Sequence, residues 1–481
     1  MLNQQPKHWL NFIGGAWVDS DRRIEVRDPS TDQVFATIAS AGSEHVEQAM
    51  AAARRTVQQG ALTRQRPAER AELLHRIGGE IRKLAEEGAE VASRENGKSV
   101  NDARDEFLES ARYFEYYAGM ADKIEGKSIP LGEDYIDFTC YEPQGVSVQI
   151  VPWNFPVSIC ARSLAPALAA GNAVVVKSPE LSPLAITLLA VACERAGLPA
   201  GALSVLAGPG REIGAALVAH QDTNQIVFTG SVPTGQAIMR SAAERAVPCV
   251  MELGGKSAAV AFADADLDQL MASVQGGIFF NAGQVCSAMS RLLVQREIYD
   301  EVVGRVAELA QGLSIGGGRD NPDLTPVVSM QQRDGILSMC RDAEADGARL
   351  VTGGYPVDGL PGAFVQPTVF ADVTPQMRLF CEEVFGPVIA ITPFDSEAEA
   401  FELANGTDYG LVAGVFTRDL SRALRAAQVL EAGQVFVNEW FAGGIETPFG
   451  GNRLSGYGRE KGQEALYSYV RTKNVAIRVS R

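Results

Sequence analysis

The chain has 481 residues and a formal net charge of -16, with 59 acidic against 43 basic side chains. This length predicts two or three domains, each with a core of its own. The acidic balance argues against a nucleic-acid partner, because such binding needs clustered lysine and arginine.

The N-terminus and the cysteines narrow the cellular context. The N-terminal sequence has no basic segment followed by an apolar run, and the apolar stretch 183–193 is too short to span a bilayer. We therefore expect no membrane association and a cytoplasmic location. The seven cysteines never fall at C-x-x-C spacing, so neither a disulfide framework nor a metal site is expected.

Polar amphipathic patterns dominate the first third of the chain. Residues 43–57 and 67–93 repeat apolar side chains at helical spacing, which predicts surface helices. The segment 123–145 instead alternates apolar and polar residues, and the final segment 467–480 also has a strand pattern. These two distant segments are expected either to pair as an arm or to form an ordinary edge hairpin.

Short β-branched runs alternate with helical segments from about residue 145. This alternation predicts a parallel sheet with helices on its faces. The pattern begins again after residue 256, which predicts a second α/β domain with a boundary near Gly254 and Gly255. The predicted strands are residues 145–151, 173–178, 203–208, 225–230 and 249–255, followed by 257–264, 291–295, 411–417 and 433–440.

The ends of two predicted strands carry candidate binding residues. Gly230 and Ser231 form a glycine turn between a strand and a helix, which can bind phosphate through backbone N–H groups, although most such turns are only turns. Lys177 and Glu180 lie at the end of the strand 173–178. They are candidates for contacts with nucleotide hydroxyls or phosphates, with a solvated charge pair as the alternative.

Asn154 precedes a helix that starts with proline. Its amide is a candidate donor to an oxyanion, with an N-terminal helix cap as the commoner alternative. Phe155, Ile159 and Arg162 follow on one helical face. Arg162 is expected either to form an internal salt bridge or to bind an anionic end of a substrate.

Cys286 lies among small and amide side chains in FFNAGQVCSAM, residues 279–289. None of the four histidines lies in a motif typical of a cysteine-protease partner, which argues against a histidine-activated nucleophile. Glu252 ends an apolar strand and is a candidate general base, or a structural carboxylate. A cysteine together with a carboxylate that later activates water makes a two-step acyl-transfer site.

Eight motifs follow one another over almost the whole chain: PWNFP, VVKSPE, FTGSVPTG, MELGGKS, FFNAGQVCSA, EEVFGPV, VNEW and PFGGNRLSGYGRE. Together they resemble the NAD(P)-dependent aldehyde dehydrogenase superfamily. The resemblance implies an α/β fold with a Rossmann-like cofactor domain, an α/β catalytic domain and a small β arm for assembly into a homodimer or homotetramer. The implied boundaries are 1–122 and 144–253 for the NAD-binding domain, 254–453 for the catalytic domain, and 123–143 and 466–481 for the oligomerisation arm.

The resemblance also implies a role for each catalytic residue. Cys286 matches the nucleophile that attacks the aldehyde carbon, and the Asn154 side chain with the Cys286 backbone N–H matches the oxyanion site. Glu252 matches the base that activates water to hydrolyse the thioester. Its presence favours the hydrolytic branch over the branch that acylates coenzyme A.

Cofactor contacts are implied in the same way. Lys177 and Glu180 match the adenosine-ribose contacts, and the carboxylate at Glu180 favours NAD over NADP, with NADP as the weaker alternative. The remaining matches lie in the pyrophosphate and nicotinamide regions. They are Trp153, Gly230 and Ser231 for the pyrophosphate, and Glu383 and Phe385 for the nicotinamide ribose and ring.

Two departures from the family pattern bear on the mechanism and the substrate. Many members have lysine where this chain has Ser163, and that lysine shares a proton path with a glutamate that matches Glu460, so a role for Glu460 in such a path is open. Arg162 resembles members that act on carboxylate-tailed semialdehydes and members that act on aromatic aldehydes. Semialdehyde enzymes often add an arginine where this chain has Phe280.

The expected substrate is therefore an aromatic or other hydrophobic aldehyde. Phe155, Phe280 and Phe441, with Trp440 beside the last, favour this class over a carboxylate-tailed semialdehyde, for which Arg162 is the candidate contact. A cysteine esterase that works without a cofactor is the alternative from another class of enzyme.

Overall fold

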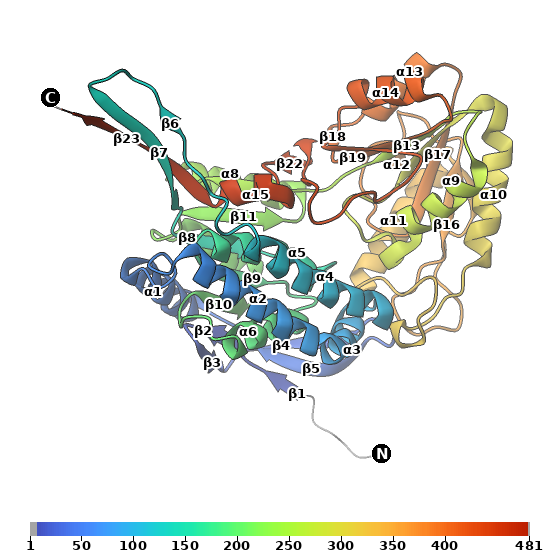
Figure 1. The fold of residues 1–481 in the computed structure, drawn as a ribbon. Coiled ribbons are helices and arrows are strands. Elements are labelled where there is room, and N and C mark those ends of the chain that lie inside the picture. The colour runs from blue at the N-terminus through green and yellow to red at the C-terminus, as the bar shows by residue number, and fades with distance from the viewer. Residues whose placement is uncertain (1–6, 480–481) are drawn as a thin grey trace.

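The computed structural model describes residues 7–479. Residues 1–6 and 480–481, which the predicted domain boundaries include, lie outside the described part of the chain. The first sheet has the order β22-β12-β11-β8-β9-β10-β2-β3 (Figure 1). Its five central strands run parallel, and all five were predicted: β8 (Val146–Ile150), β9 (Ala173–Ser178), β10 (Leu203–Ala207), β11 (Gln225–Thr229) and β12 (Cys249–Glu252).

Helices cover both faces of this sheet because its strands are buried on both sides. One face packs on α2 (Pro67–Lys83), α4 (Val100–Ala118), α5 (Pro156–Ala169) and α6 (Ala185–Arg195). The other face packs on α1 (Ser43–Gln59), and α7 (Ala215–Ala219) and α8 (Val232–Ala243) lie beside it. Every residue of α5 is buried, so this helix lies in the core.

The second sheet has the order β15-β16-β17-β14-β13-β19-β20. Four of its strands were predicted: β13 (Ala258–Ala261), β14 (Arg291–Gln295), β19 (Val412–Phe416) and β20 (Gln434–Val437). Three were not: β15 (Arg349–Thr352), β16 (Thr368–Ala371) and β17 (Val388–Phe394). The helices of this half are α9 (Leu267–Val274), α10 (Tyr299–Gly312), α11 (Met330–Ala345), α12 (Arg378–Cys381), α13 (Glu397–Asn405) and α14 (Leu420–Val429).

The first third of the chain is less helical than expected. Its additional strands are β1 (Lys7–Trp9), β2 (Asn11–Ile13), β3 (Ala16–Val18), β4 (Arg23–Asp28) and β5 (Gln33–Ala39). Three of them have only three residues, too few for an alternating pattern to stand out. The predicted helical segment 67–93 is divided at Leu84 into α2 and α3 (Ala85–Asn96).

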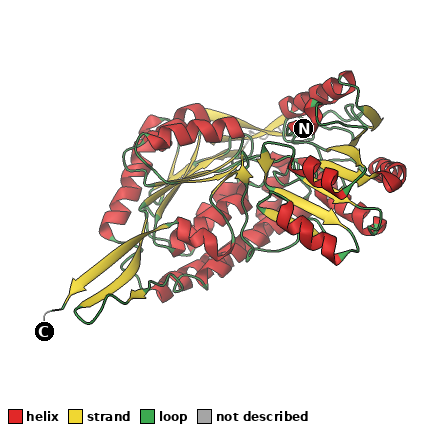
Figure 2. Ribbon diagram, turned by 90° about the horizontal axis from the view of Figure 1, so that it is seen from above, coloured by secondary structure: helices red, strands yellow, loops and turns green. Residues whose placement is uncertain are grey.

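Two distant segments pair as an arm that projects from the body (Figures 1 and 2). β7 (Tyr135–Pro143) pairs antiparallel with β23 (Val470–Arg478) over nine residues of each, and β6 (Ser128–Ile129) extends this sheet. The predicted pairing of the two segments is therefore confirmed. Helix α15 (Gly462–Ser468) occupies the first residues of the predicted C-terminal strand.

The chain returns to the first sheet before it enters the arm. β22 (Gly456–Tyr457) pairs antiparallel with β12, and β21 (Asn452–Arg453) pairs with β18 (Tyr409–Gly410). This return places the C-terminal segment beside Glu252, since Glu252 is the pairing partner of Gly456. Within residues 7–479, no helix is both long and apolar enough to cross a membrane.

Candidate active site

Four neighbouring parallel strands, in the order β12-β11-β8-β9, bring the predicted residues to one edge of the first sheet. Trp153 and Asn154 follow β8, Gly230 and Ser231 follow β11, and Glu252 ends β12. β9 and β10 follow one another on one side of β8, whereas β11 and β12 lie on its other side. The strand order therefore reverses at β8, and the crevice beside β8 is the expected ligand site of such a fold.

A cavity of about 440 Å³ opens beside this edge and reaches Cys286. Its walls come from α4, α5, the loop that carries Cys286, the segment 434–449, and the turn before α15. The predicted residues that line it are Phe155, Arg162, Phe280, Cys286 and Phe441. It also contains Asp102, Asp105, Glu106, Glu109, Phe449 and Lys461, none of which was predicted as a site residue.

Asn154 is tied to the loop that carries the cysteine. Its side-chain Nδ2 donates to the carbonyl oxygen of Gln284 at 3.0 Å, two residues before Cys286. The helix-cap alternative for Asn154 is wrong, because the N-cap position of α5 is Phe155 and no side chain caps it. One of the two N–H groups of the Asn154 amide is therefore engaged with the loop, and the second is left for another acceptor.

A buried ion pair between Lys98 and Glu106, which the sequence did not predict, fixes the backbone of Asn154. Lys98 Nζ lies 2.6 Å from Glu106 Oε2 and 2.8 Å from the carbonyl oxygen of Asn154. Glu106 Oε1 accepts hydrogen bonds from the backbone N–H groups of Val157 and Ser158, in the first turn of α5. This pair thus supplies the acceptor that a helix cap would otherwise supply.

Cys286 lies against the glycine pair that follows Glu252. A Cβ on Gly255 would lie 2.6 Å from the Cys286 carbonyl oxygen, so only glycine permits this approach. Burial raises the pKa of the Cys286 thiol to about 11, and the charge of Arg162 opposes that rise. In this state of the protein the cysteine is a thiol at neutral pH.

Glu252 is buried, and neither of its carboxylate oxygens has a hydrogen-bond partner within the described residues. Burial, followed by the nearby charge of Glu460, raises the pKa of Glu252 well above its ordinary value. Gly450 makes room for the side chain, since a Cβ there would lie 2.8 Å from Glu252 Oε1. An unpartnered carboxyl group of this kind can accept a proton from a neighbouring thiol or water.

Glu383 and Phe385 lie at the same edge. The Gly255 N–H donates to Glu383 Oε1 at 3.1 Å, and a Cβ on Gly254 would collide with Glu383 Oε2 at 2.2 Å. Burial raises the pKa of Glu383 to about 7. Phe385 meets Trp153 edge to face, with 5.3 Å between ring centroids.

Lys177, Glu180 and Ser231 surround the outer part of the crevice. Lys177 Nζ lies 3.7 Å from Glu180 Oε1, and the same oxygen accepts from the Gly210 N–H at 2.8 Å. Burial lowers the pKa of Lys177. Ser231 is the N-cap residue of α8, but its hydroxyl bonds to Thr234 and does not cap the helix, whose first N–H groups remain open to an anion.

Arg162 forms the internal salt bridge that was one of its two predicted roles. Its guanidinium pairs with Glu460, and Ser163 Oγ donates to the other oxygen of the same carboxylate. Both partners of the salt bridge are buried. Arg162 still lines the cavity, but its charge is already neutralised there.

Part of the cavity wall is aromatic. Phe155 and Phe280 stack with 5.8 Å between centroids and 22° between planes, and Phe441 and Phe449 add further ring surface. Trp440, expected at the substrate entrance, lies behind this wall: it is buried, and its Nε1 donates to the Ser287 carbonyl oxygen at 3.1 Å.

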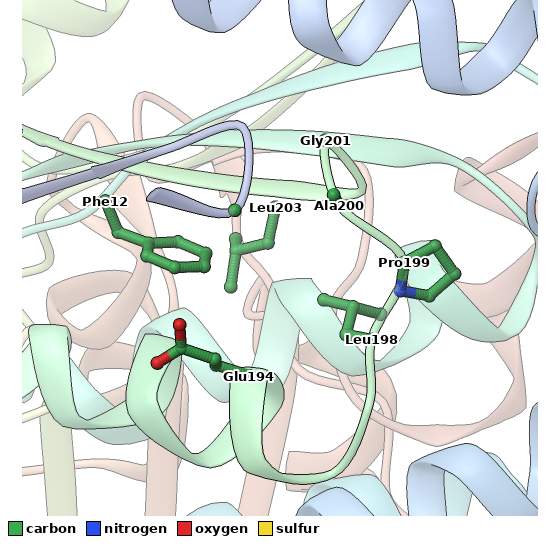
Figure 3. A pocket seen from close by; sticks show the side chains of 8 residues that line it. Phe12, Glu194, Leu198, Pro199, Ala200, Gly201 and Leu203 are labelled. Carbon is green, nitrogen blue, oxygen red and sulfur yellow. The ribbon is translucent and has the colours of Figure 1, made fainter. Parts of the chain in front are cut away.

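A second cavity, of about 100 Å³, lies at another part of the first sheet (Figure 3). It is bordered by Phe12, Leu198, Pro199 and Leu203 and by Glu194, which accepts a hydrogen bond from Trp17 Nε1 at 3.1 Å. None of the predicted site residues lines it. The described residues also contain no group of three or more His, Cys, Asp or Glu side chains placed to hold a metal ion.

Known proteins resemble this chain over almost its whole length, both in sequence and in structure. The aldehyde dehydrogenase family matches residues 17–475 of the chain. An aldehyde dehydrogenase of Emericella nidulans is 40% identical over 97% of this chain and 95% of its own length, and a betaine aldehyde dehydrogenase of Cereibacter sphaeroides is 41% identical over 97% and 96%. The NAD+ complex of an aldehyde dehydrogenase from Bacillus cereus superposes with a TM-score of 0.96 at 37% identity, covering 100% of this chain and 98% of that one.

Proposed function

The chain belongs to the aldehyde dehydrogenase family, and we propose that it oxidises an aldehyde to the carboxylic acid with NAD as the hydride acceptor. The observation that carries this proposal is the meeting of three predicted residues from separate parts of the chain. Cys286 lines the cavity, and the Asn154 side chain is hydrogen-bonded to the loop that carries Cys286. Glu252 is a buried carboxyl group with no hydrogen-bond partner among the described residues. It lies three residues before Gly255, whose backbone packs against Cys286.

In the first step, Cys286 attacks the aldehyde carbon. The thiol proton passes to Glu252, the C–S bond forms, and the carbonyl oxygen becomes an oxyanion. The free N–H of the Asn154 amide and the Cys286 backbone N–H donate to that oxyanion. NAD, when bound, supplies the acceptor for the hydride that leaves the former aldehyde carbon, so that a thioester remains on Cys286.

Between the two steps, Glu252 releases the thiol proton to solvent. In the second step, the Glu252 carboxylate takes a proton from water, and the resulting hydroxide attacks the thioester carbon. The C–S bond breaks, the carboxylic acid leaves, and the departing Cys286 thiolate takes back a proton from Glu252. Burial raises the pKa of Glu252 well above its ordinary value, which supports both proton transfers because a raised pKa makes the carboxylate a stronger base. In the neighbouring Arg162–Glu460 pair, the charge of Glu460 raises the pKa of Glu252 and the charge of Arg162 opposes that rise. Ser163, which bonds to Glu460, stands where the family pattern has lysine, so the lysine step of that proton path is missing here.

The residues at the strand ends fit NAD. Glu180 and Glu383 offer carboxylates to two sets of ribose hydroxyls, and the N-terminus of α8 with Gly230 and Ser231 offers N–H groups to a pyrophosphate. Lys177 joins Glu180 at the adenosine ribose, Trp153 joins Gly230 and Ser231 at the pyrophosphate, and Phe385 gives the nicotinamide an aromatic neighbour. The carboxylate of Glu180 would repel a 2′-phosphate, which favours NAD over NADP.

The cavity supports an aromatic or hydrophobic aldehyde as substrate. Phe155, Phe280 and Phe441 supply apolar walls, whereas the carboxylates of Asp102 and Asp105 face the same cavity and would repel an acidic tail. The Arg162 salt bridge weakens the semialdehyde alternative further, because its guanidinium already has a carboxylate partner.

We expect the protein to assemble in the cytoplasm as a homodimer or homotetramer through its arm. The arm exposes apolar side chains, which favour association. They are Ile129, Leu131, Tyr135, Ile136, Phe138, Ile477 and Val479. Analytical ultracentrifugation of the double variant Ile136→Lys and Ile477→Lys should show a smaller species than the wild type, and an unchanged sedimentation coefficient would contradict this role.

The activity is tested by NADH formation from a panel of aliphatic, aromatic and carboxylate-tailed aldehydes. The Cys286→Ala variant should form no NADH, whereas Cys140→Ala, a half-buried cysteine of the arm, should retain activity. Ester cleavage that does not depend on NAD, without NADH formation from any aldehyde, would instead favour the cysteine esterase.

A further inference from the structure

Two side chains of opposite charge, Lys461 and Glu109, line the cavity without a part in the mechanism above. Glu109 comes from α4, and Lys461 from the turn before α15. Glu109 Oε2 accepts from Ser158 Oγ at 2.7 Å, and Glu109 Oε1 accepts from Tyr113 Oη at 3.4 Å. The Glu109 carboxylate is therefore held in place with acceptor capacity left over.

Lys461 differs from the other cations of the site. Arg162 is paired with Glu460 and Lys98 with Glu106, whereas no carboxylate in the described part of the chain lies within 4 Å of the Lys461 ammonium. Burial lowers the pKa of Lys461, and the charge of Glu109 opposes that shift. A half-buried ammonium with no ion pair is stabilised when a ligand brings a hydrogen-bond acceptor to it.

The backbone of Lys461 is in a conformation that favours glycine, with φ 59° and ψ 172°. Its neighbours hold it there. Glu460 exchanges two backbone hydrogen bonds with Phe449, at 2.7 and 2.8 Å, and the Gly462 N–H donates to Ile445 at 2.8 Å. Lys461 is one of several residues other than glycine with a positive φ, and it is the one among them whose ammonium lines the cavity.

We propose that Lys461 and Glu109 form a subsite for a ring hydroxyl of an aromatic aldehyde, which names the substrate class of the activity proposed above and rests on it. The Lys461 ammonium donates to the hydroxyl oxygen, and the hydroxyl donates its proton to the Glu109 carboxylate. Phe449, whose ring centroid lies 5.9 Å from Lys461 Nζ, adds apolar surface for the ring.

A substrate that carries a hydrogen or a carboxylate in place of the ring hydroxyl makes poorer interactions with Lys461 and Glu109. An unsubstituted ring covers the Lys461 ammonium without giving it an acceptor and leaves the remaining acceptor capacity of Glu109 unused, which costs binding energy. A carboxylate would pair with Lys461 but meet Glu109, Asp102 and Asp105 in the same cavity. A hydroxyl is both donor and acceptor, so it satisfies the two groups together.

The test compares kcat/KM for 4-hydroxybenzaldehyde and 3-hydroxybenzaldehyde with that for benzaldehyde and 4-carboxybenzaldehyde. In the wild type, kcat/KM for whichever hydroxybenzaldehyde is the better substrate should exceed kcat/KM for benzaldehyde by about tenfold or more. This ratio of the two kcat/KM values should fall toward one in Lys461→Met and in Glu109→Gln. Lys83→Met, an exposed lysine of α2, is the matched control and should keep the ratio. Calorimetric binding of the same aldehydes to Cys286→Ala should show the same order without turnover.

Lys461→Gly separates a binding role from a structural one. Glycine relieves the backbone, so the melting temperature should equal or exceed that of the wild type while the hydroxyl preference is lost. A ratio that stays at its wild-type value in both Lys461 variants, or a preference for 4-carboxybenzaldehyde, overturns the subsite. Absence of any NADH from all four aldehydes would count against the proposed aromatic substrate instead, so the two failures are distinct.

Discussion

Lys98 Nζ lies 2.6 Å from Glu106 Oε2, with the two side chains 0% and 2% exposed. The same ammonium holds the Asn154 carbonyl oxygen, and the same carboxylate holds the first turn of α5. The position of Asn154, the proposed oxyanion donor, therefore depends on the Lys98–Glu106 ion pair, which takes no part in the proposed reaction steps. Such a pair positions a catalytic residue, and its loss should affect turnover as well as stability.

The variant Glu106→Gln should lower the free energy of unfolding by about 3 kcal/mol, because it leaves the Lys98 ammonium buried without its counter-charge. It should also lower kcat by more than it raises KM, since a displaced Asn154 weakens binding of the oxyanion rather than of the aldehyde. Denaturant unfolding and steady-state kinetics measure the two effects. Glu80→Gln removes a surface pair with Lys83 and should change either quantity little; equal losses in the two variants would contradict the positioning role.

A second buried pair, Arg162 with Glu460, should behave as a structural unit. Arg162→Leu leaves Glu460 unpaired and should lower the free energy of unfolding by about 3 kcal/mol, whereas the double variant with Glu460→Gln should recover part of that loss. If Arg162 instead binds a carboxylate-tailed aldehyde, the single variant will lose activity on that aldehyde alone. Arg82→Leu, at an exposed pair with Glu115, is the control.

Cys286 should respond to pH and to cofactor. Because burial raises its pKa to about 11, only a small fraction of the thiol is ionised at neutral pH, and that fraction increases with pH. Alkylation of Cys286 by iodoacetamide, followed by peptide mass spectrometry, should accelerate by about tenfold per pH unit between about pH 7 and pH 9. Bound NAD brings a cationic nicotinamide near the thiol and should increase the rate at a given pH. Equal rates with and without NAD would contradict this account.

Cofactor preference should change with Glu180. The carboxylate is held at the end of β9 by the Gly210 N–H, so Glu180→Gln keeps the shape and removes the charge. We expect the ratio of kcat/KM for NADP to that for NAD to rise by about tenfold, with a parallel change in the two dissociation constants. Glu244→Gln, at the exposed C-terminal end of α8, should leave the ratio as it is. An unchanged ratio in Glu180→Gln would place cofactor choice elsewhere.

The sequence predicted most of the strands that are buried on both sides, although it missed β16 and β17. Strands such as β9 and β11 have a central run of apolar, mostly β-branched residues, and their ends mark the sheet edge where Lys177 and Ser231 lie. The alternating patterns of the segments that form β7 and β23 left an arm and an edge hairpin open, and the family resemblance favoured the arm. The three-residue strands near the N-terminus were missed because three residues are too few to show the alternation of apolar and polar side chains that predicts a strand.

The missed site residues had no local signal. Lys98 and Glu106 are charged side chains in a polar helical region, where charges are ordinarily solvated, and only tertiary packing shows that the pair is buried. Lys461 looked like any surface lysine, since its positive φ is a property of the folded turn. Trp440 was expected at the entrance because it lies next to Phe441 in the same loop. The sequence does not show which side chains of a loop are buried, and Trp440 is one of the buried ones.

The central claim, a thioester on Cys286 that Glu252 helps to hydrolyse, is tested most directly by trapping the acyl enzyme. Glu252→Gln should form the thioester but release it slowly. Mass spectrometry of this variant after rapid mixing with benzaldehyde and NAD should show a benzoyl adduct on the peptide that contains Cys286, together with one equivalent of NADH. NADH formation with no adduct on Cys286, or an adduct on another residue, would contradict the account.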